Sequence, residues 1–403
     1  MKQPLLLIAA FAFVANALSA QDRNLARRCF EEGEVAYLGG RFAESLDHYN
    51  RGLAIDAGFY EAYPSRAAVK ERLGDWSGAV TDYNIFLEAF PENREAHFGR
   101  GLARYHAGQY DFAAADFRYL LETPSSGETN TIFYRQSPMG GGTDRIVTAQ
   151  GDLRDHIYNY LGLALYEQGN YSEAISSFDS AIQLNPQEPD YFTHRGLARQ
   201  DNGDAEGAEA DYRLALRLDP SHSIAYHNLS ILLKGRGEQE SRELLDKAIE
   251  NNPELSYPYI ERGAYLLEEE DYTGALRDFN TALQLDPKSA ENWLNRGLAK
   301  EKVGDLRGAY HDFTRTIALA PQLEKAWLSR GNILTKQQRF AEAVEDYSVA
   351  ITYYPEYGIA WLNRAIAHHR LGKKQAACAD ARRAASLGVE GTERLLRVVC
   401  GGQ

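Results

Sequence analysis

Hydrophobic and polar positions along most of this chain follow a helical pattern that returns about every 34 residues. One unit spans residues 290–321, AENWLNRGLAKEKVGDLRGAYHDFTRTIALAP. It reads as two short amphipathic helices, with apolar residues at the spacing of one helix face, joined by a tight turn. A single hairpin of this kind cannot bury its apolar face, so copies are expected to stack on one another. The pattern therefore predicts an all-α solenoid.

Three markers set the frame from residue 26 to about residue 389. The first is a small residue where the two helices of a unit meet: Gly33, Ala67, Gly101, Gly162, Gly196, Ser230, Gly263, Gly297, Gly331 and Ala365. The second is a small residue in the second helix: Ser45, Ala79, Ala113, Ala174, Ala208, Ser241, Ala275, Ala309, Ala343 and Ala377. The third is a closing proline: Pro91, Pro186, Pro220, Pro253, Pro287, Pro321 and Pro355. Packed helices approach closely only where side chains are small, and proline ends one helix while fitting the start of the next unit.

Together with recurring aromatic residues such as Trp293, Trp327, Trp361, Phe279 and Phe313, these markers resemble the tetratricopeptide repeat (TPR). The resemblance covers nearly the whole chain beyond its first residues and implies about ten repeats in a right-handed superhelix. Repeats one to three are expected at 26–124 and repeats four to ten at 152–389. A capping helix and tail are expected at 390–403, with Thr392 as the helix N-cap.

Residues 125–151 interrupt the frame between repeats three and four. Segments 131–136 and 145–149 are rich in β-prone residues, and a Ser, Pro and Gly cluster lies between them. The insertion is expected to form a two-stranded β-hairpin or an ordered loop. It is either a tolerated insertion or a contact element for a partner.

The composition of the chain indicates which kinds of partner it can bind. Lys and Arg number 44 against 57 Asp and Glu, for a net charge of -13. This balance argues against a nucleic-acid partner, because phosphate binding needs clustered basic residues. The ten His show no metal-ligand spacing, and the sequence holds no nucleotide motif and no arrangement for nucleophilic catalysis. We therefore expect no metal, no cofactor and no enzymatic activity.

The first 20 residues are typical of a secretory signal. Lys2 provides a minimal basic region, residues 5–14 are apolar, and small residues follow. Cleavage is expected after Ala17 or after Ala20. The apolar run is short for a membrane span, so we expect an exported protein, periplasmic or secreted, without a transmembrane segment after signal removal.

Three cysteines remain to be placed. In an oxidising compartment Cys378 and Cys400 could form a disulfide; otherwise they are two buried thiols. Cys29 falls on a core position of the first hairpin and is expected to be a small buried hydrophobe.

An Arg and an Asp recur together, 16 residues apart. The pairs are Arg66 and Asp82, Arg100 and Asp116, Arg195 and Asp211, Arg262 and Asp278, Arg296 and Asp312, Arg330 and Asp346, and Arg364 and Asp380. Repeats that lack the Arg also lack the Asp, as with Glu32 and His48 or Leu161 and Ser177. Residues that appear and vanish together are expected to touch, and the planar Arg fork suits a carboxylate. We predict structural ion pairs that join the two helices of a hairpin.

The resemblance also implies a concave groove lined by the first helix of each repeat. Candidate partner-binding residues there and on the insertion are Phe30, Tyr37, Phe98, Leu102, Tyr105, Asn159, Tyr166, Tyr134 and Arg135. Their apolar character favours a peptide-binding groove, with packing between neighbouring helices as the alternative. The leading interpretation is an exported protein-interaction scaffold. A holding or assembly chaperone for exported chains is the second, and an enzyme that uses Tyr134, Arg135, Asp144 and Arg145 is a weaker third.

Overall fold

The computed structural model describes residues 19–123, 130–135, 145–150 and 153–401, with the backbone alone for 130–135 and 145–150. The predicted signal segment falls almost wholly outside this part of the chain. No described helix combines the length and the apolar composition that a membrane span requires.

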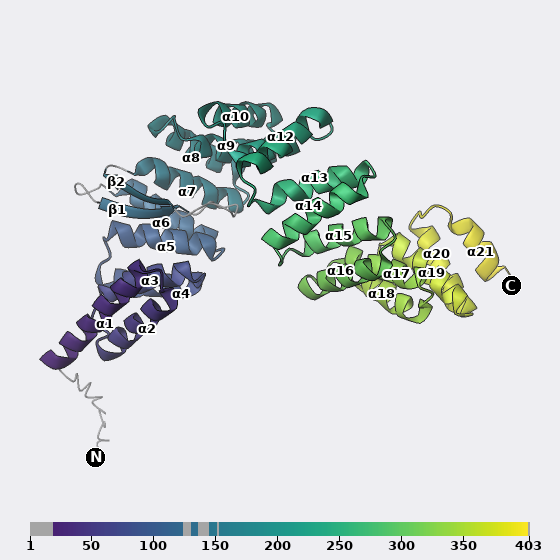
Figure 1. Cartoon of the computed structure of the whole chain (residues 1–403), viewed down its shortest axis with the longest axis horizontal. Coiled ribbons are helices and arrows are strands. Elements are labelled where there is room, and N and C mark those ends of the chain that lie inside the picture. Colours follow the sequence, from purple (N-terminus) through teal and green to yellow (C-terminus); the bar gives the residue numbers. More distant parts are fainter. Residues whose placement is uncertain (1–18, 124–129, 136–144, 151–152, 402–403) are drawn as a thin grey trace, which may run out of the picture. The chain divides into compact units, whose positions relative to one another are not determined.

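The chain divides into two compact units, each built from helical hairpins (Figure 1). The first unit contains α1 (Ala20–Leu38), α2 (Phe42–Ile55), α3 (Ala62–Arg72), α4 (Trp76–Ala89), α5 (Arg94–His106), α6 (Tyr110–Glu122), β1 (Asn130–Arg135), β2 (Arg145–Gln150), α7 (Arg154–Glu167), α8 (Tyr171–Leu184), α9 (Pro189–Asp201) and α10 (Ala205–Leu218). The second contains α11 (Ser223–Leu233), α12 (Glu238–Asn251), α13 (Ser256–Glu268), α14 (Tyr272–Leu285), α15 (Ala290–Lys302), α16 (Leu306–Leu319), α17 (Glu324–Lys336), α18 (Phe340–Tyr353), α19 (Gly358–Arg370), α20 (Lys374–Ser386) and α21 (Thr392–Cys400). The predicted all-α solenoid of stacked hairpins is confirmed.

The small residue of the first helix lets the aromatic residue of the second lie against the helix backbone. A Cβ atom built on Gly297 would lie 2.6 Å from the Phe313 ring. The same close approach, at 2.5–2.8 Å, recurs at Gly33, Gly101, Gly162, Gly196, Gly263 and Gly331. Repeat two has Ala67 instead, and its Tyr83 ring lies against Gly99 of the following repeat.

Most hairpin turns contain a residue in the left-handed conformation. In eight repeats that residue is a glycine with φ between 71° and 88°: Gly40, Gly74, Gly108, Gly169, Gly203, Gly235, Gly304 and Gly372. Glu270 and Gln338 take the same conformation with φ of 64° and 62°. A side chain is strained there, because its Cβ crowds the backbone.

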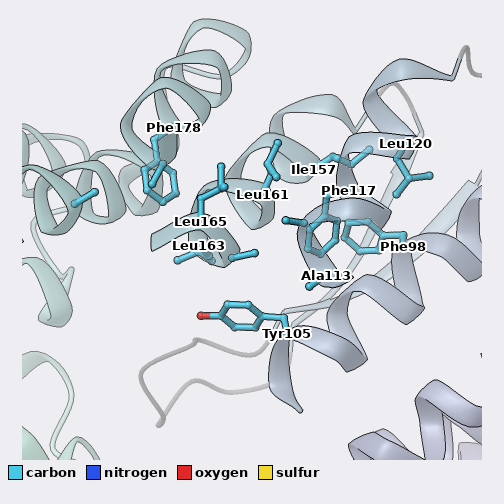
Figure 2. Close-up of a cluster of buried hydrophobic side chains, with 14 residues drawn as sticks. Phe98, Tyr105, Ala113, Phe117, Leu120, Ile157, Leu161, Leu163, Leu165 and Phe178 are labelled. Carbon is cyan, nitrogen blue, oxygen red and sulfur yellow. The ribbon is translucent and has the colours of Figure 1, made fainter. Parts of the chain in front are cut away.

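The hydrophobic core continues across the insertion. Phe98, Phe117, Leu161 and Phe178 belong to one buried cluster drawn from α5, α6, α7 and α8 (Figure 2). The helices on either side of residues 125–151 therefore pack directly on each other. The inserted residues form an antiparallel pair, in which Asn130 faces Gln150 and Arg135 faces Arg145.

The last helix, α21, packs on the final repeat. Val399 is buried against Ala365, Ala377 and Ala381. The prediction that Thr392 is the N-cap is wrong: Gly391 holds that position with φ of 77°, and Thr392 begins the helix. The Thr392 hydroxyl donates instead to the Val389 carbonyl at 3.0 Å, because the turn before α21 places that acceptor next to it.

Candidate functional site

The odd-numbered helices α1, α3, α5, α7 and α9 form one face of the first unit. Direct contacts join α1 to α3, α5 to α7, and α7 to α9. We call this surface the odd-helix face and define it by the residues four positions after each small marker residue. These residues are Tyr37, Glu71, Tyr105, Tyr166 and Gln200.

Three predicted contact residues are buried. Phe98 is 5% exposed, Tyr105 7% and Asn159 6%. The Phe98 ring contacts Tyr160 of the next repeat at a centroid distance of 5.8 Å, and Asn159 Oδ1 lies 2.8 Å from His194 Nδ1. These side chains hold neighbouring repeats together, which is the packing alternative raised above.

Four predicted contact residues keep part of their surface exposed. Phe30 and Leu102 pack at the edges of buried clusters. Tyr37 meets the Phe42 ring edge to face at 5.6 Å, and the Tyr166 hydroxyl donates to Asp201 Oδ2 at 2.5 Å. The remaining two, Tyr134 and Arg135, lie in β1, and their side chains are outside the described part of the chain, as are those of Asp144 and Arg145.

Each of the seven Arg and Asp pairs is brought together in the structure. In every pair the Arg binds its Asp with two hydrogen bonds, Nε to Oδ2 at 2.7–3.1 Å and Nη2 to Oδ1 at 2.6–2.9 Å. All seven Asp side chains are buried. In repeat one, where the pattern has Glu32 and His48, the two side chains also meet, at 3.2 Å. The pairs join the two helices of a hairpin and are not available for chemistry.

The same arginines make a third contact that sequence reasoning missed. Nη1 donates to a polar residue 16 positions earlier, on the second helix of the preceding repeat. The acceptors are Asn50, Asn84, Asp179, Asp246, Asn280, Thr314 and Ser348. The signal was present as a polar residue at a fixed offset before each Arg. Each Arg therefore ties two successive repeats together.

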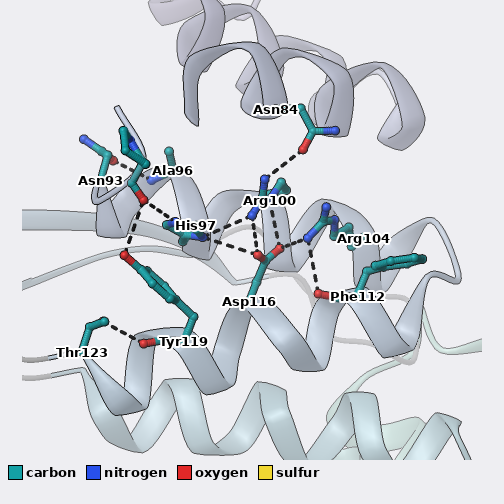
Figure 3. Close-up of polar contacts among 11 residues, drawn as sticks. Asn84, Asn93, Ala96, His97, Arg100, Arg104, Phe112, Asp116, Tyr119 and Thr123 are labelled. Atoms are coloured by element: carbon teal, nitrogen blue, oxygen red, sulfur yellow. Dashed lines mark hydrogen bonds and ion pairs between the residues drawn. The ribbon is translucent and has the colours of Figure 1, made fainter. Parts of the chain in front are cut away.

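Repeat three carries the most elaborate version of this network (Figure 3). Asp116 binds Arg100 and also Arg104, whose Nη1 lies 2.6 Å from Oδ2. His97 donates from Nε2 to the Pro91 carbonyl at 2.8 Å. Burial opposes ionisation of Asp116, but hydrogen bonds from His97 and Arg100 and the nearby arginine charges hold its pKa below the ordinary value. Arg104 Nε is buried without a hydrogen-bond partner among the described residues, but the Asp116 carboxylate is paired with both arginines, and the network is structural.

Glu71 on the odd-helix face differs from these satisfied groups. The Tyr83 hydroxyl hydrogen-bonds its carboxyl group. Its Oε1 atom is inaccessible to solvent and has no hydrogen-bond partner among the described residues. Burial raises the pKa of Glu71 to about 7, although the Tyr83 hydrogen bond and the Arg72 charge act in the opposite direction. The sequence did not single out Glu71. Its position, four residues after the small marker residue, holds polar or aromatic residues in several repeats, so a glutamate there looked ordinary.

The cysteines form one disulfide and leave one free thiol. Cys378 and Cys400 form a disulfide with their Cα atoms 5.2 Å apart, so α21 is bonded covalently to α20. Cys29 is a buried free thiol. Within the described residues, no group of three His, Cys, Asp or Glu side chains is placed to hold a metal ion.

Comparison with known families points to one type of repeat. Models described as "Tetratricopeptide repeat" match residues 66–128, 189–222 and 262–329, and one described as "TPR repeat" matches residues 162–203 and 331–372. Together these matches cover most of the predicted repeats.

Curated relatives share only part of their length with this chain. The TPR repeat-containing thioredoxin TTL4 of Arabidopsis thaliana is 33% identical over 121 residues, which is 30% of this chain and 18% of that protein. The tetratricopeptide repeat and J domain-containing co-chaperone DNJ1 of Fusarium oxysporum is 26% identical over 220 residues, 53% of this chain and 38% of that protein. This chain therefore spans less than half the length of either relative.

Solved structures show the same fold. The crystal structure of the APC/C hetero-tetramer Cut9–Hcn1 aligns with 93% of this chain and 76% of its own at a TM-score of 0.52 and 13% sequence identity. At this identity the likeness concerns the fold alone.

Proposed function

Because this chain belongs to the tetratricopeptide-repeat family, we propose that it is a non-catalytic scaffold that binds a protein or peptide partner on the odd-helix face. The observation that carries this proposal is the difference between the two sets of aromatic residues in the first unit. The aromatic residues of the even helices that lie against the marker glycines, such as Phe117 and Phe178, are fully buried. Tyr37 and Tyr166 on the odd helices keep exposed surface, and part-exposed aromatic residues are typical of binding sites.

The proposed place of action is outside the cytoplasm. A disulfide between Cys378 and Cys400 supports this, because disulfides persist in oxidising compartments and are rare in reducing ones. The signal-like first 20 residues support it independently. The test is to trap free thiols by alkylation directly in living cells and to compare the full chain with a variant lacking residues 1–20. Free thiols at both cysteines in the full chain would overturn the proposal.

A photo-crosslinker on the odd-helix face tests the scaffold role. p-Benzoylphenylalanine is placed at Tyr166, in a second variant at Tyr37 and, as a matched control, at Phe112, an aromatic residue of α6 that is 61% exposed. The expected result is one or two defined adducts from Tyr166 and none of these from Phe112. Absence of any specific adduct from both Tyr166 and Tyr37 would contradict the proposal.

A holding or assembly chaperone is the second candidate. It is supported by the likeness to a co-chaperone, DNJ1, over about half of this chain. The same crosslinking experiment separates the two roles, since a chaperone gives many different adducts at Tyr166 and a scaffold gives few.

A further inference from the structure

Two glutamates occupy the same position of different repeats but have different partners. Glu301 on α15 accepts a hydrogen bond from Lys336 Nζ at 2.8 Å, and Lys336 lies 35 residues later on the next odd helix. The residue 35 positions after Glu71 is His106. The His106 ring stacks on Trp76 with the two ring centroids 4.4 Å apart. Glu71 therefore lacks the lysine that its counterpart Glu301 has within the chain.

The cation near Glu71 does not take the place of that lysine: the Arg72 charge lowers the pKa of Glu71 but leaves its Oε1 atom without a hydrogen-bond partner among the described residues. The Arg72 guanidinium lies over the Phe42 ring, 5.9 Å from its centroid. Burial lowers the pKa of His106, which favours its neutral imidazole. A buried carboxylate without a full set of partners is energetically unfavourable and is stabilised by a cation.

The surroundings of Glu71 add negative charge and aromatic rings. Glu95 and Tyr37 both lie close enough to Tyr83 to act on its hydroxyl electrostatically. Burial raises the pKa of Glu95 as well. Carboxylates beside the faces of tyrosine and tryptophan rings are the chemistry that recognises ammonium and guanidinium groups.

Tyrosine–carboxylate contacts recur along the first unit. Besides Tyr83 and Glu71, the hydroxyls of four other tyrosines hydrogen-bond carboxylates: Tyr49 with Glu34, Tyr110 with Glu167, Tyr166 with Asp201, and Tyr191 with Asp155. In the second unit, Tyr265 and Tyr347 meet neutral groups, namely the Ser241 hydroxyl, the Asn332 amide oxygen and the Thr335 hydroxyl. The acidic and aromatic character therefore extends beyond the single site at Glu71.

We propose that the odd-helix face binds a basic, extended segment of the partner protein and that a lysine or arginine side chain of that segment pairs with Glu71. The partner's cation takes the place that Lys336 takes beside Glu301. This assignment rests on the proposed scaffold function and names the chemistry of its partner. The overall charge of -13 also favours a basic segment over an acidic one.

Binding of this kind is coupled to deprotonation of Glu71. A group with a pKa of about 7 is ionised in roughly a tenth of molecules at pH 6 and in about nine tenths at pH 8. A lysine side chain, with a pKa of about 10.4, stays charged over this range. Burial raises the pKa of the Tyr83 hydroxyl well above its ordinary value and lowers the pKa of His106, so Glu71 is the group beside this site that changes charge between pH 6 and pH 8. Affinity is therefore expected to rise about tenfold from pH 6 to pH 8.

The test uses the folded full chain and a defined probe. The probe is an acetylated and amidated seven-residue peptide of alternating alanine and lysine, with peptides carrying norleucine or glutamate in place of lysine as controls. Calorimetry at constant ionic strength gives Kd at pH 6 and pH 8. We expect the lysine peptide to bind at least tenfold more tightly than both control peptides at pH 8, and this preference to shrink at pH 6.

Matched variants locate the effect. Glu71→Gln places at this position the residue that repeat five already has, Gln200, whose side chain accepts from Tyr212 at 3.2 Å. We expect it to weaken lysine-peptide binding about tenfold at pH 8 and to remove the pH dependence. His106→Lys should fill the site from within the chain and weaken the peptide similarly, whereas Glu301→Gln should change neither Kd.

Three outcomes would overturn this inference: equal binding of lysine and norleucine peptides, equal binding to the native chain and Glu71→Gln, or unchanged binding to His106→Lys. Retention of specific adducts at Tyr166 in any of these cases would leave the scaffold function standing. Loss of those adducts as well would overturn both proposals.

Discussion

Replacing Glu71 with glutamine should stabilise the protein at high pH and leave its stability nearly unchanged at low pH. The carboxyl group has a pKa of about 7 in the folded chain against a reference value of 4.5. Between these values the unfolded chain has lost this proton while the folded chain still holds it. The contribution of the Glu71 carboxyl group to the unfolding free energy of the native chain is therefore complete below about pH 4.5. This contribution is lost as the pH rises through about 7.

The size of the effect follows from the shift. One pKa unit corresponds to about 1.4 kcal/mol, so the native chain should lose about 3 kcal/mol of unfolding free energy between pH 4 and pH 8 through this group. Glutamine does not ionise and can retain the contact with Tyr83, as Gln200 does with Tyr212. Glu71→Gln should thus exceed the native chain by about 3 kcal/mol at pH 8 and match it at pH 4.

Urea unfolding followed by far-UV circular dichroism, at pH 4, 6 and 8, measures the difference. Glu301→Gln is the control: its carboxylate binds the half-exposed Lys336, so its loss should change the unfolding free energy by less than about 1 kcal/mol. A difference between Glu71→Gln and the native chain that is the same at pH 4 and pH 8 would refute the reasoning.

Three further predictions concern the repeat itself and are measured by thermal unfolding. Arg296→Ala should destabilise by about 3 kcal/mol, because it leaves the fully buried Asp312 with Lys300 as its remaining cation; equal melting temperatures for this variant and Lys302→Ala would count against the structural pairing. Gly297→Ala should cost about 1–3 kcal/mol, since the added Cβ would lie 2.6 Å from the Phe313 ring; an unchanged melting temperature would show that the ring moves freely. Gln338→Gly should stabilise by about 0.5–1 kcal/mol by removing a side chain from a residue with φ of 62°, and the reverse change, Gly304→Gln, should destabilise; the same sign for both would contradict the strain argument.

Contacts inside one hairpin were predictable from the sequence. The Arg296 and Asp312 pair spans only 16 residues, and the pattern repeats often enough that its two members are seen to appear together. The same holds for the close approach at Gly297, because a small residue in a fixed frame has a local cause. The register of the repeats follows from such local rules.

Contacts between repeats were harder to predict. The burial of Phe98 depends on Tyr160, which follows the insertion, and the odd-helix position alone did not distinguish it from the part-exposed Tyr166. The disulfide stayed one of two alternatives, because only the packing of α21 on α20 brings the two Cα atoms to 5.2 Å. The burial of Phe98 and the formation of the disulfide both depend on how the following helices pack on a repeat.

The sequence by itself determined the repeat, its helical hairpin and its internal ion pairs, because helical periodicity and contacts within one hairpin are local properties of the chain. Only the tertiary structure decided which odd-helix residues stay accessible and which charges stay unpaired. Glu71 and Glu301 are the same residue in the same frame position. Glu301 binds Lys336, whereas the residue at the corresponding position for Glu71 is His106, which stacks on Trp76. The physical reason is that the environment of a carboxylate is set by the neighbouring repeat, and burial there changes its protonation.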